Sequence, residues 1–127
     1  MHKGYLLDTH VFLWWLEDSP RQPEAFNRLL RTTTAPIFVS VVSLWEIRLK
    51  SVVGKLTVAT DVENQVETEG FRTLSLLPAH VHCFAQLATT HPDPFDRLLW
   101  AQCLEEKLQL LTADASLQQW TGSAIVF

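Results

Sequence analysis

Four acidic residues in this sequence stand where they could bind a metal ion. Asp8 directly follows the apolar run YLL, and Asp114 closes the run LQLLTAD. Glu46 and Asp96 lie near the starts of two predicted helices. Carboxylate oxygens without histidine or cysteine suit Mg²⁺ or Mn²⁺ rather than zinc. Because such ions activate water and neutralise charge on a leaving oxygen, the pattern indicates hydrolysis of phosphodiester bonds.

Each of these acids also has an ordinary structural interpretation. Asp8 and Asp114 can each cap the helix that follows them. Ser43 and Glu46 have the spacing of a capping box, and Glu46 and Lys50 have the spacing of a surface ion pair. A helix cap can also bind a metal, so the two interpretations do not exclude each other. The joint occurrence of all four acids is harder to explain by capping alone.

Strand-like and helix-like segments alternate along the whole chain. Strands are predicted at GYLLD, at 37–39, at FRTLSL and at LQLLTAD, with AIVF (124–127) as a last edge strand. Helices are predicted at 10–16, PEAFNRLLR, SLWEIRLKSV, 61–69, PAHVHCFAQLA and DPFDRLLWAQCLEEK, with a short one after LQLLTAD. This alternation predicts an α/β fold, with a mostly parallel sheet covered by helices on both faces. Such sheets bind ligands at the carboxyl ends of their strands, where the chain order reverses.

Composition favours a single compact domain over residues 1–127. The chain is 47% hydrophobic and 19% charged, which suits a domain with a proper core. No apolar run is long enough to span a bilayer or to form a signal peptide, so we expect a cytoplasmic protein. Cys83 and Cys103 lack CxxC spacing and are predicted to be buried thiols.

The net charge of −4 argues against diffuse electrostatic binding of nucleic acid. Bound divalent cations would reverse the local field around the acids, so a phosphate backbone could still dock there.

Four segments of the chain resemble, in the same order, the signature segments of PIN-domain proteins, in particular the VapC-like toxins of bacterial toxin–antitoxin pairs. These segments are YLLDTHVFLWWL, SVVSLWEIRLKSVVGKL, HPDPFDRLLWAQCLE and LQLLTAD. The resemblance implies a single PIN-like domain with a sheet of four to five strands. It also implies an Mg²⁺- or Mn²⁺-dependent endoribonuclease, with Asp8, Glu46, Asp96 and Asp114 as the catalytic metal ligands.

Further residues acquire possible roles from this resemblance. Asp96 takes the ligand position in HPDPFDRLLWAQ and Asp93 becomes the helix N-cap, although Asp93 could also orient a metal-bound water. Thr9 and Thr112 flank the first and last acids, and their hydroxyls could hold a carboxylate or water, or simply make local hydrogen bonds.

Lys50 and Arg97 are the cations nearest to the acids in the sequence. Either could contact the RNA backbone or form an exposed ion pair.

The resemblance further implies an RNA substrate, a cognate VapB-like antitoxin bound in a groove beside the acidic site, and a symmetric homodimer. Trp14 and Trp15 are adjacent in one predicted helix and cannot both face inward, so one of them should be partly exposed at such an interface. Trp45, Trp100 and Trp120 are expected to pack in the core.

Two other functions must be weighed. A receiver-type phosphoacceptor domain also carries acids at the carboxyl edge of its sheet, but it pairs two acids after the first strand and has a lysine after the last. Here Asp8 is followed by Thr9, and no lysine follows LQLLTAD. A PIN-fold module that binds RNA or protein without cleavage is the stronger alternative, and the presence of all four acids argues against it.

Overall fold

The computed structural model describes residues 2–122, which form an α/β fold around a four-stranded parallel sheet. The strand order is β3-β2-β1-β4. The strands are β1 (Tyr5–Leu7), β2 (Ile37–Ser40), β3 (Arg72–Leu74) and β4 (Gln109–Leu111). Strand β1 pairs in parallel with both β2 and β4, so the chain order reverses between β1 and β4. The predicted parallel sheet is confirmed, while the edge strand predicted at AIVF lies outside the described residues.

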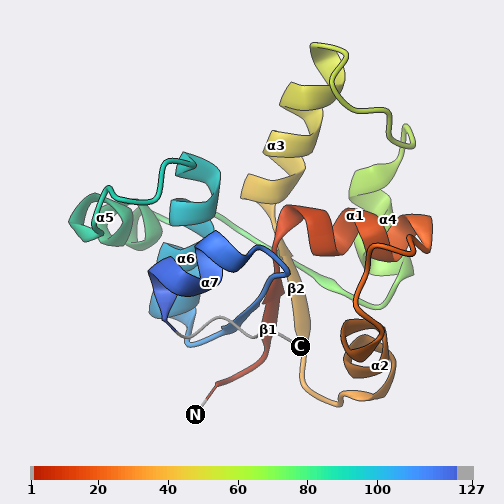
Figure 1. Ribbon diagram of the computed structural model, residues 1–127, viewed down its shortest axis with the longest axis horizontal. Helices are drawn as coiled ribbons and strands as arrows, with labels where there is room; N and C mark the ends of the chain where they lie inside the picture. The colour runs from red at the N-terminus through yellow and green to blue at the C-terminus, as the bar shows by residue number, and fades with distance from the viewer. Residues whose placement is uncertain (1, 123–127) are drawn as a thin grey trace.

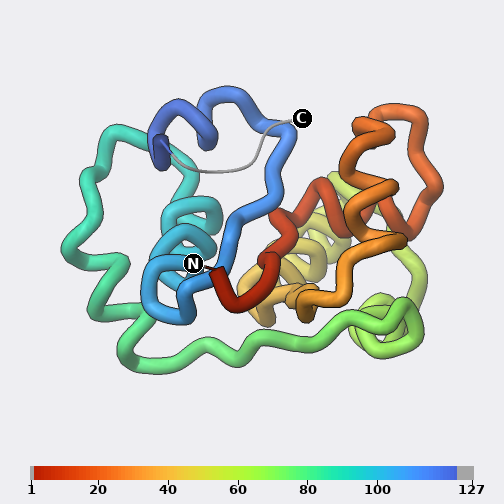
Figure 2. The backbone as a smooth tube through the Cα atoms, turned by 90° about the horizontal axis from the view of Figure 1, so that it is seen from below, coloured from red at the N-terminus to blue at the C-terminus, as the bar shows by residue number. Residues whose placement is uncertain are grey.

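Helices cover both faces of this sheet, as predicted. They are α1 (Thr9–Glu17), α2 (Glu24–Thr32), α3 (Val41–Val52), α4 (Val62–Thr68), α5 (Pro78–Gln86), α6 (Pro94–Glu106) and α7 (Ala115–Thr121). In Figure 1, α1, α2 and α4 lie on one side of the strands and α5, α6 and α7 on the other, while α3 projects beyond the end of β2. Figure 2 shows the green segment that contains β3 crossing from α4 to α5.

Two adjacent residues of β1 pack in two separate hydrophobic cores, one on each face of the sheet. Leu6 packs in the core that includes Leu99 and Leu110, and Leu7 packs in the core that includes Phe12 and Leu111. Successive side chains of a strand point to opposite faces, so apolar residues at both positions are what a sheet covered on both faces requires. The sheet is thus packed on both faces, and its carboxyl edge carries the residues that follow the strands.

Two predictions about α3 are wrong. The helix begins directly after β2, and Ser40 is its N-cap, with a hydroxyl that accepts a hydrogen bond from the Val42 N–H over 3.0 Å. Ser43 therefore lies inside the helix and forms no capping box with Glu46. Trp45 was expected in the core, but it is 57% exposed.

The predictions for the cysteines and for the adjacent tryptophans agree with the structure. Cys83 and Cys103 are buried free thiols. Trp14 and Trp15 are both partly exposed. Among residues 2–122, no helix is long and apolar enough to cross a membrane.

Candidate active site

Asp8 lies at the carboxyl end of β1 and is 5% exposed. It caps α1, because Oδ1 accepts a hydrogen bond of 2.8 Å from the Val11 N–H. Its Oδ2 accepts a hydrogen bond from the Thr112 hydroxyl. Burial raises the pKa of Asp8 above its ordinary value, the two hydrogen bonds oppose this, and the charge of Asp114 adds to it. The carboxylate is therefore held in place in an environment that disfavours its negative charge.

Asp114 is joined to Asp8 through Thr112. Thr112 follows β4. Its hydroxyl oxygen accepts a hydrogen bond of 3.0 Å from the Asp114 N–H, and the same hydroxyl donates a hydrogen bond to Asp8. Asp114 caps α7, with Oδ1 accepting from the Ser116 N–H and hydroxyl at 2.9 and 2.7 Å. Partial burial raises the pKa of Asp114, but the hydrogen bonds from Ser116 and Leu117 outweigh burial and leave it lower than usual.

Glu46 projects from α3 and is 4% exposed. The Thr9 hydroxyl donates to its Oε1 over 2.6 Å and lies 3.0 Å from the Ser43 hydroxyl. The Lys50 ammonium pairs with Oε2 at 2.6 Å, as the i, i+4 spacing predicts. Because Thr9 directly follows Asp8, this hydrogen bond places Glu46 beside the end of β1.

Asp96 lies in the first turn of α6, and Asp93 is the N-cap of that helix, as predicted. Asp93 Oδ1 accepts from the N–H groups of Phe95 and Asp96 at 2.9 and 3.4 Å. Burial raises the pKa of Asp96 to about 6; a hydrogen bond with His91 opposes the rise, and the charges of Asp93 and Asp8 add to it. Asp96 therefore interacts electrostatically with Asp8, which lies at the carboxyl edge of the sheet.

Asp8 and Asp114 therefore lie at the predicted carboxyl edge of the sheet, at the reversal between β1 and β4, and Asp96 and Glu46 interact with residues of that edge. Asp8 interacts electrostatically with Asp96 and Asp114, and Glu46 is connected through Thr9. Within the described part of the chain, no three histidine, cysteine, aspartate or glutamate side chains are arranged to hold one metal ion. The donors themselves fit a hard divalent cation, because they are all carboxylate oxygens and burial disfavours the charge of two of them.

The two cations singled out in the sequence have different surroundings. Lys50 pairs with Glu46, and its side chain is 39% exposed. The Arg97 guanidinium lies 5.1 Å from the centre of the Phe84 ring and forms no ion pair with residues 2–122. The exposed ion pair considered for Arg97 is thus replaced by packing on an aromatic ring.

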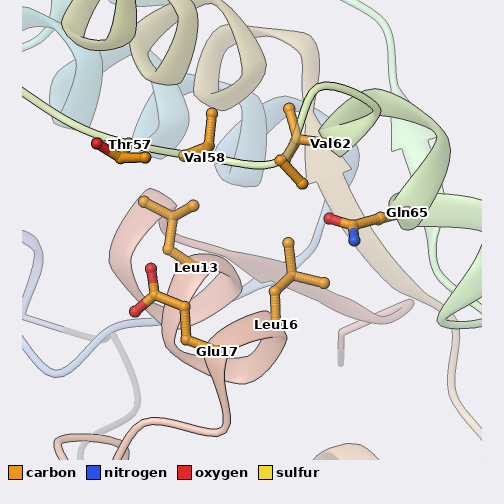
Figure 3. Close-up of a pocket in the computed structure, with 8 residues that line it drawn as sticks. Leu13, Leu16, Glu17, Thr57, Val58, Val62 and Gln65 are labelled. Carbon is orange, nitrogen blue, oxygen red and sulfur yellow. The ribbon is translucent and has the colours of Figure 1, made fainter. Parts of the chain in front are cut away.

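A groove of about 370 Å³ lies along α1, the helix that Asp8 caps. Figure 3 shows Leu13 and Leu16 of α1 facing Val58 and Val62 across the groove. Glu17, Thr57, Ala59 and Gln65 complete its lining.

The sequence model of the PIN domain matches residues 5–121 of this chain. The chain belongs to the PIN domain family. Its resemblance to that family, carried by four short segments, is thereby confirmed. The matched range contains the five acids described above, namely Asp8, Glu46, Asp93, Asp96 and Asp114.

Individual relatives agree with this assignment. The PIN domain is 27% identical over 116 residues to ribonuclease VapC22 of Mycobacterium tuberculosis, covering 89% of this chain and 88% of that protein. A toxin–antitoxin complex from Klebsiella pneumoniae contains a chain of similar fold, with a TM-score of 0.69, 10% identity and 96% of each chain covered. VapBC2 from Rickettsia felis, solved with a DNA fragment from its promoter, has a TM-score of 0.69, 13% identity and 97% of each chain covered.

His91 also lies at this site, although the sequence predicts no role for it. His91 is buried and bonded to Asp96, yet no metal-site spacing or catalytic motif marks it. Only its place in the same short segment, HPDPFD, could have drawn attention to it.

Proposed function

We propose that this PIN domain is an endoribonuclease that depends on Mg²⁺ or Mn²⁺. The observation that carries the proposal is the convergence of the buried carboxylate of Asp8 and the partly buried carboxylate of Asp96 at the carboxyl edge of the sheet, where burial disfavours their charge. A divalent cation would neutralise these charges and remove that penalty, so cation binding is favoured at this site. The relative from M. tuberculosis, named as a ribonuclease, supports the same activity.

Asp8, Glu46, Asp96 and Asp114 would hold the cation. When bound, it supplies an activated water and neutralises charge on the phosphodiester. Thr112 keeps the carboxylate of Asp8 in one orientation, and Thr9 does the same for Glu46. Asp93 fixes the start of α6 and hence the position of Asp96. The carboxylates have no acid–base role in this mechanism.

Lys50 is the cation best placed to meet RNA at this site. Its ammonium forms an ion pair with Glu46, and its side chain remains partly exposed. It can therefore contact a backbone phosphate while it stays next to the proposed metal ligands. Arg97 is a weaker candidate, because its guanidinium is occupied by the ring of Phe84.

The biological role we propose is that of a toxin neutralised by a cognate VapB-like antitoxin in the cytoplasm, where its RNA substrates are found. Two structural neighbours are toxin–antitoxin complexes. The groove lined by Leu13, Leu16, Val58 and Val62 offers an apolar surface for a segment of the antitoxin. A homodimer is supported by the apolar side chains that α3 and its end expose, namely Trp45, Leu49, Val52 and Val53.

Cleavage of a mixed panel of tRNA, rRNA and mRNA by purified protein, with Mn²⁺ or Mg²⁺ and with EDTA, tests this function. Cation-dependent cleavage is expected. RNA binding with no cleavage of any RNA, by folded protein that binds Mn²⁺, would instead favour the non-cleaving module.

A further inference from the structure

A histidine that the proposed mechanism does not use lies directly against the acidic site. His91 is 5% exposed, and its Nε2 is 2.9 Å from Oδ2 of Asp96. Its ring stacks on Trp120 of α7, with 5.4 Å between ring centroids and 30° between the planes. One face of the ring is thus fixed by packing while one nitrogen points at a candidate metal ligand.

The position of His91 joins the two segments that carry Asp96 and Asp114. His91 precedes α6, the helix of Asp96, and Trp120 lies on α7, the helix that Asp114 caps. His91 is hydrogen-bonded to Asp96, and its electrostatic interaction with Asp114 helps to lower the pKa of that carboxyl. An apolar aromatic residue could supply the stacking alone, so packing does not explain the nitrogen that faces Asp96.

The hydrogen bond uses only one oxygen of Asp96. With Asp96 ionised, Nε2–H is the donor and Oδ2 the acceptor. The other oxygen, Oδ1, accepts no hydrogen bond from residues 2–122 and remains available to a ligand. Partners that orient a metal-binding carboxylate in this way commonly change metal affinity by about 10- to 100-fold when removed.

We propose that His91 is a positioning residue for the cation site: Trp120 fixes its ring, and its Nε2–H holds Oδ2 of Asp96 so that Oδ1 is presented to the cation. This inference rests on the proposed function, because it requires that Asp96 bind a divalent cation. It assigns His91 no contact with the cation or with RNA.

The test is a titration of metal-free protein with Mn²⁺, in which electron paramagnetic resonance measures the concentration of unbound ion and hence the Mn²⁺ affinity. His91→Phe keeps a ring for stacking but removes the donor, and His91→Gln keeps an N–H donor at a similar reach. Trp120→Leu keeps the donor but removes the stacked ring. His80→Phe is the matched control, because His80 is also buried and is paired with an acid, Glu106, which lies at the other end of α6 from Asp96.

We expect His91→Phe to weaken Mn²⁺ binding by about 10-fold or more. His91→Gln should recover most of that loss, and Trp120→Leu should fall between them. His80→Phe should lower thermal stability but leave the Mn²⁺ affinity of the folded protein unchanged. If His91→Phe does not fold, His91→Gln decides, because it loses the stacked ring but keeps a donor. A role in packing alone predicts that His91→Gln binds Mn²⁺ no better than Trp120→Leu, whereas the positioning role predicts that it binds Mn²⁺ more tightly than Trp120→Leu.

Two failures are distinguishable. If Asp96→Asn loses Mn²⁺ binding while folded His91→Phe binds within twofold of wild type, the role of His91 is refuted and the proposed metal site stands. If wild-type protein binds no Mn²⁺, the proposed function itself falls, and the role of His91 with it.

Discussion

The hydroxyl of Thr112 donates a hydrogen bond to the carboxylate of Asp8, although the two residues are 104 positions apart in the chain. The parallel register that sets Leu7 opposite Leu111 brings them together, because each lies just beyond the end of its strand. The first and last signature segments of the PIN domain are thereby joined at one point. This contact determines which way one oxygen of Asp8 faces.

Replacing Thr112 by valine should weaken the site without unfolding the protein. Valine preserves the shape of the buried side chain but removes the donor to Asp8 and the acceptor for the Asp114 N–H. We expect a loss of about 1–3 kcal/mol in unfolding free energy and about a 10-fold loss in Mn²⁺ affinity. Thr112→Ser, which restores the hydroxyl, should recover both, as measured by urea unfolding and Mn²⁺ titration. Unchanged Mn²⁺ affinity in Thr112→Val would mean that this hydrogen bond serves the fold alone.

Asp96→Asn should stabilise the metal-free protein at neutral pH. The pKa of Asp96 is raised from 3.8 to about 6, so its protonated form favours folding. That contribution is fully present below about pH 4 and is lost as the pH rises through about 6. Asparagine avoids the loss, so at pH 8 in EDTA the variant should be more stable than wild type by up to about 3 kcal/mol.

At pH 5, the difference in unfolding free energy between Asp96→Asn and wild type should be smaller than at pH 8. Added Mn²⁺ should stabilise wild type more than the variant. The groups that act on Asp96 are Asp93, Asp8 and His91, and none of them is altered in this variant. A variant less stable than wild type at pH 8 would show that the ionised carboxylate is well compensated and carries no penalty.

Lys50→Met should raise the affinity for Mn²⁺ and lower the affinity for RNA. Loss of the ammonium frees Oε2 of Glu46 and makes the site more negative, so Mn²⁺ affinity should rise by a few-fold. RNA binding should weaken, because a phosphate contact is lost, and KM for cleavage should increase with a smaller salt dependence. Lys55→Met, at an exposed position in the loop after α3, is the control. Equal KM values for the two variants would remove Lys50 from the RNA-binding surface.

Leu16→Arg should separate inhibition by antitoxin from catalysis. Leu16 is a partly buried residue of the groove along α1, where an arginine would place a charge among Leu13, Val58 and Val62. We expect intact RNA cleavage and at least about a 100-fold loss of affinity for the cognate antitoxin, measured by calorimetry. Full inhibition of the variant by antitoxin would place the binding surface elsewhere.

The sequence predicted the sheet and the positions of Asp8 and Asp114 at strand ends well, because both depend on local signals. Apolar runs that end in Asp8 or before Asp114 mark strand ends, and the Asp93–Pro94 pair marks the start of α6. Features that depend on packing between distant elements were missed. Ser40 rather than Ser43 caps α3 because β2 enters the helix without an intervening turn, and no local signal records that junction.

The exposure of Trp45 and the contacts of His91 are of the same kind. Trp45 lies on a helix that projects from the sheet, and its ring rests on Phe95 while most of it meets solvent. The ring of His91 stacks on Trp120, which lies on α7, the last described helix. Helical periodicity predicts which residues share a face, but it does not say which faces another element will cover.

The most direct test of the central claim is cation-dependent RNA cleavage by wild type, Asp8→Asn, Asp96→Asn and a control, Asp18→Asn. Asp18 is an exposed acid at the end of α1 in a left-handed conformation that asparagine tolerates. We predict Mn²⁺-dependent cleavage by wild type and Asp18→Asn, abolished by EDTA and reduced by about 100-fold or more in the other two variants. Equal cleavage by all four proteins, or cleavage that survives EDTA, would contradict a ribonuclease centred on Asp8 and Asp96.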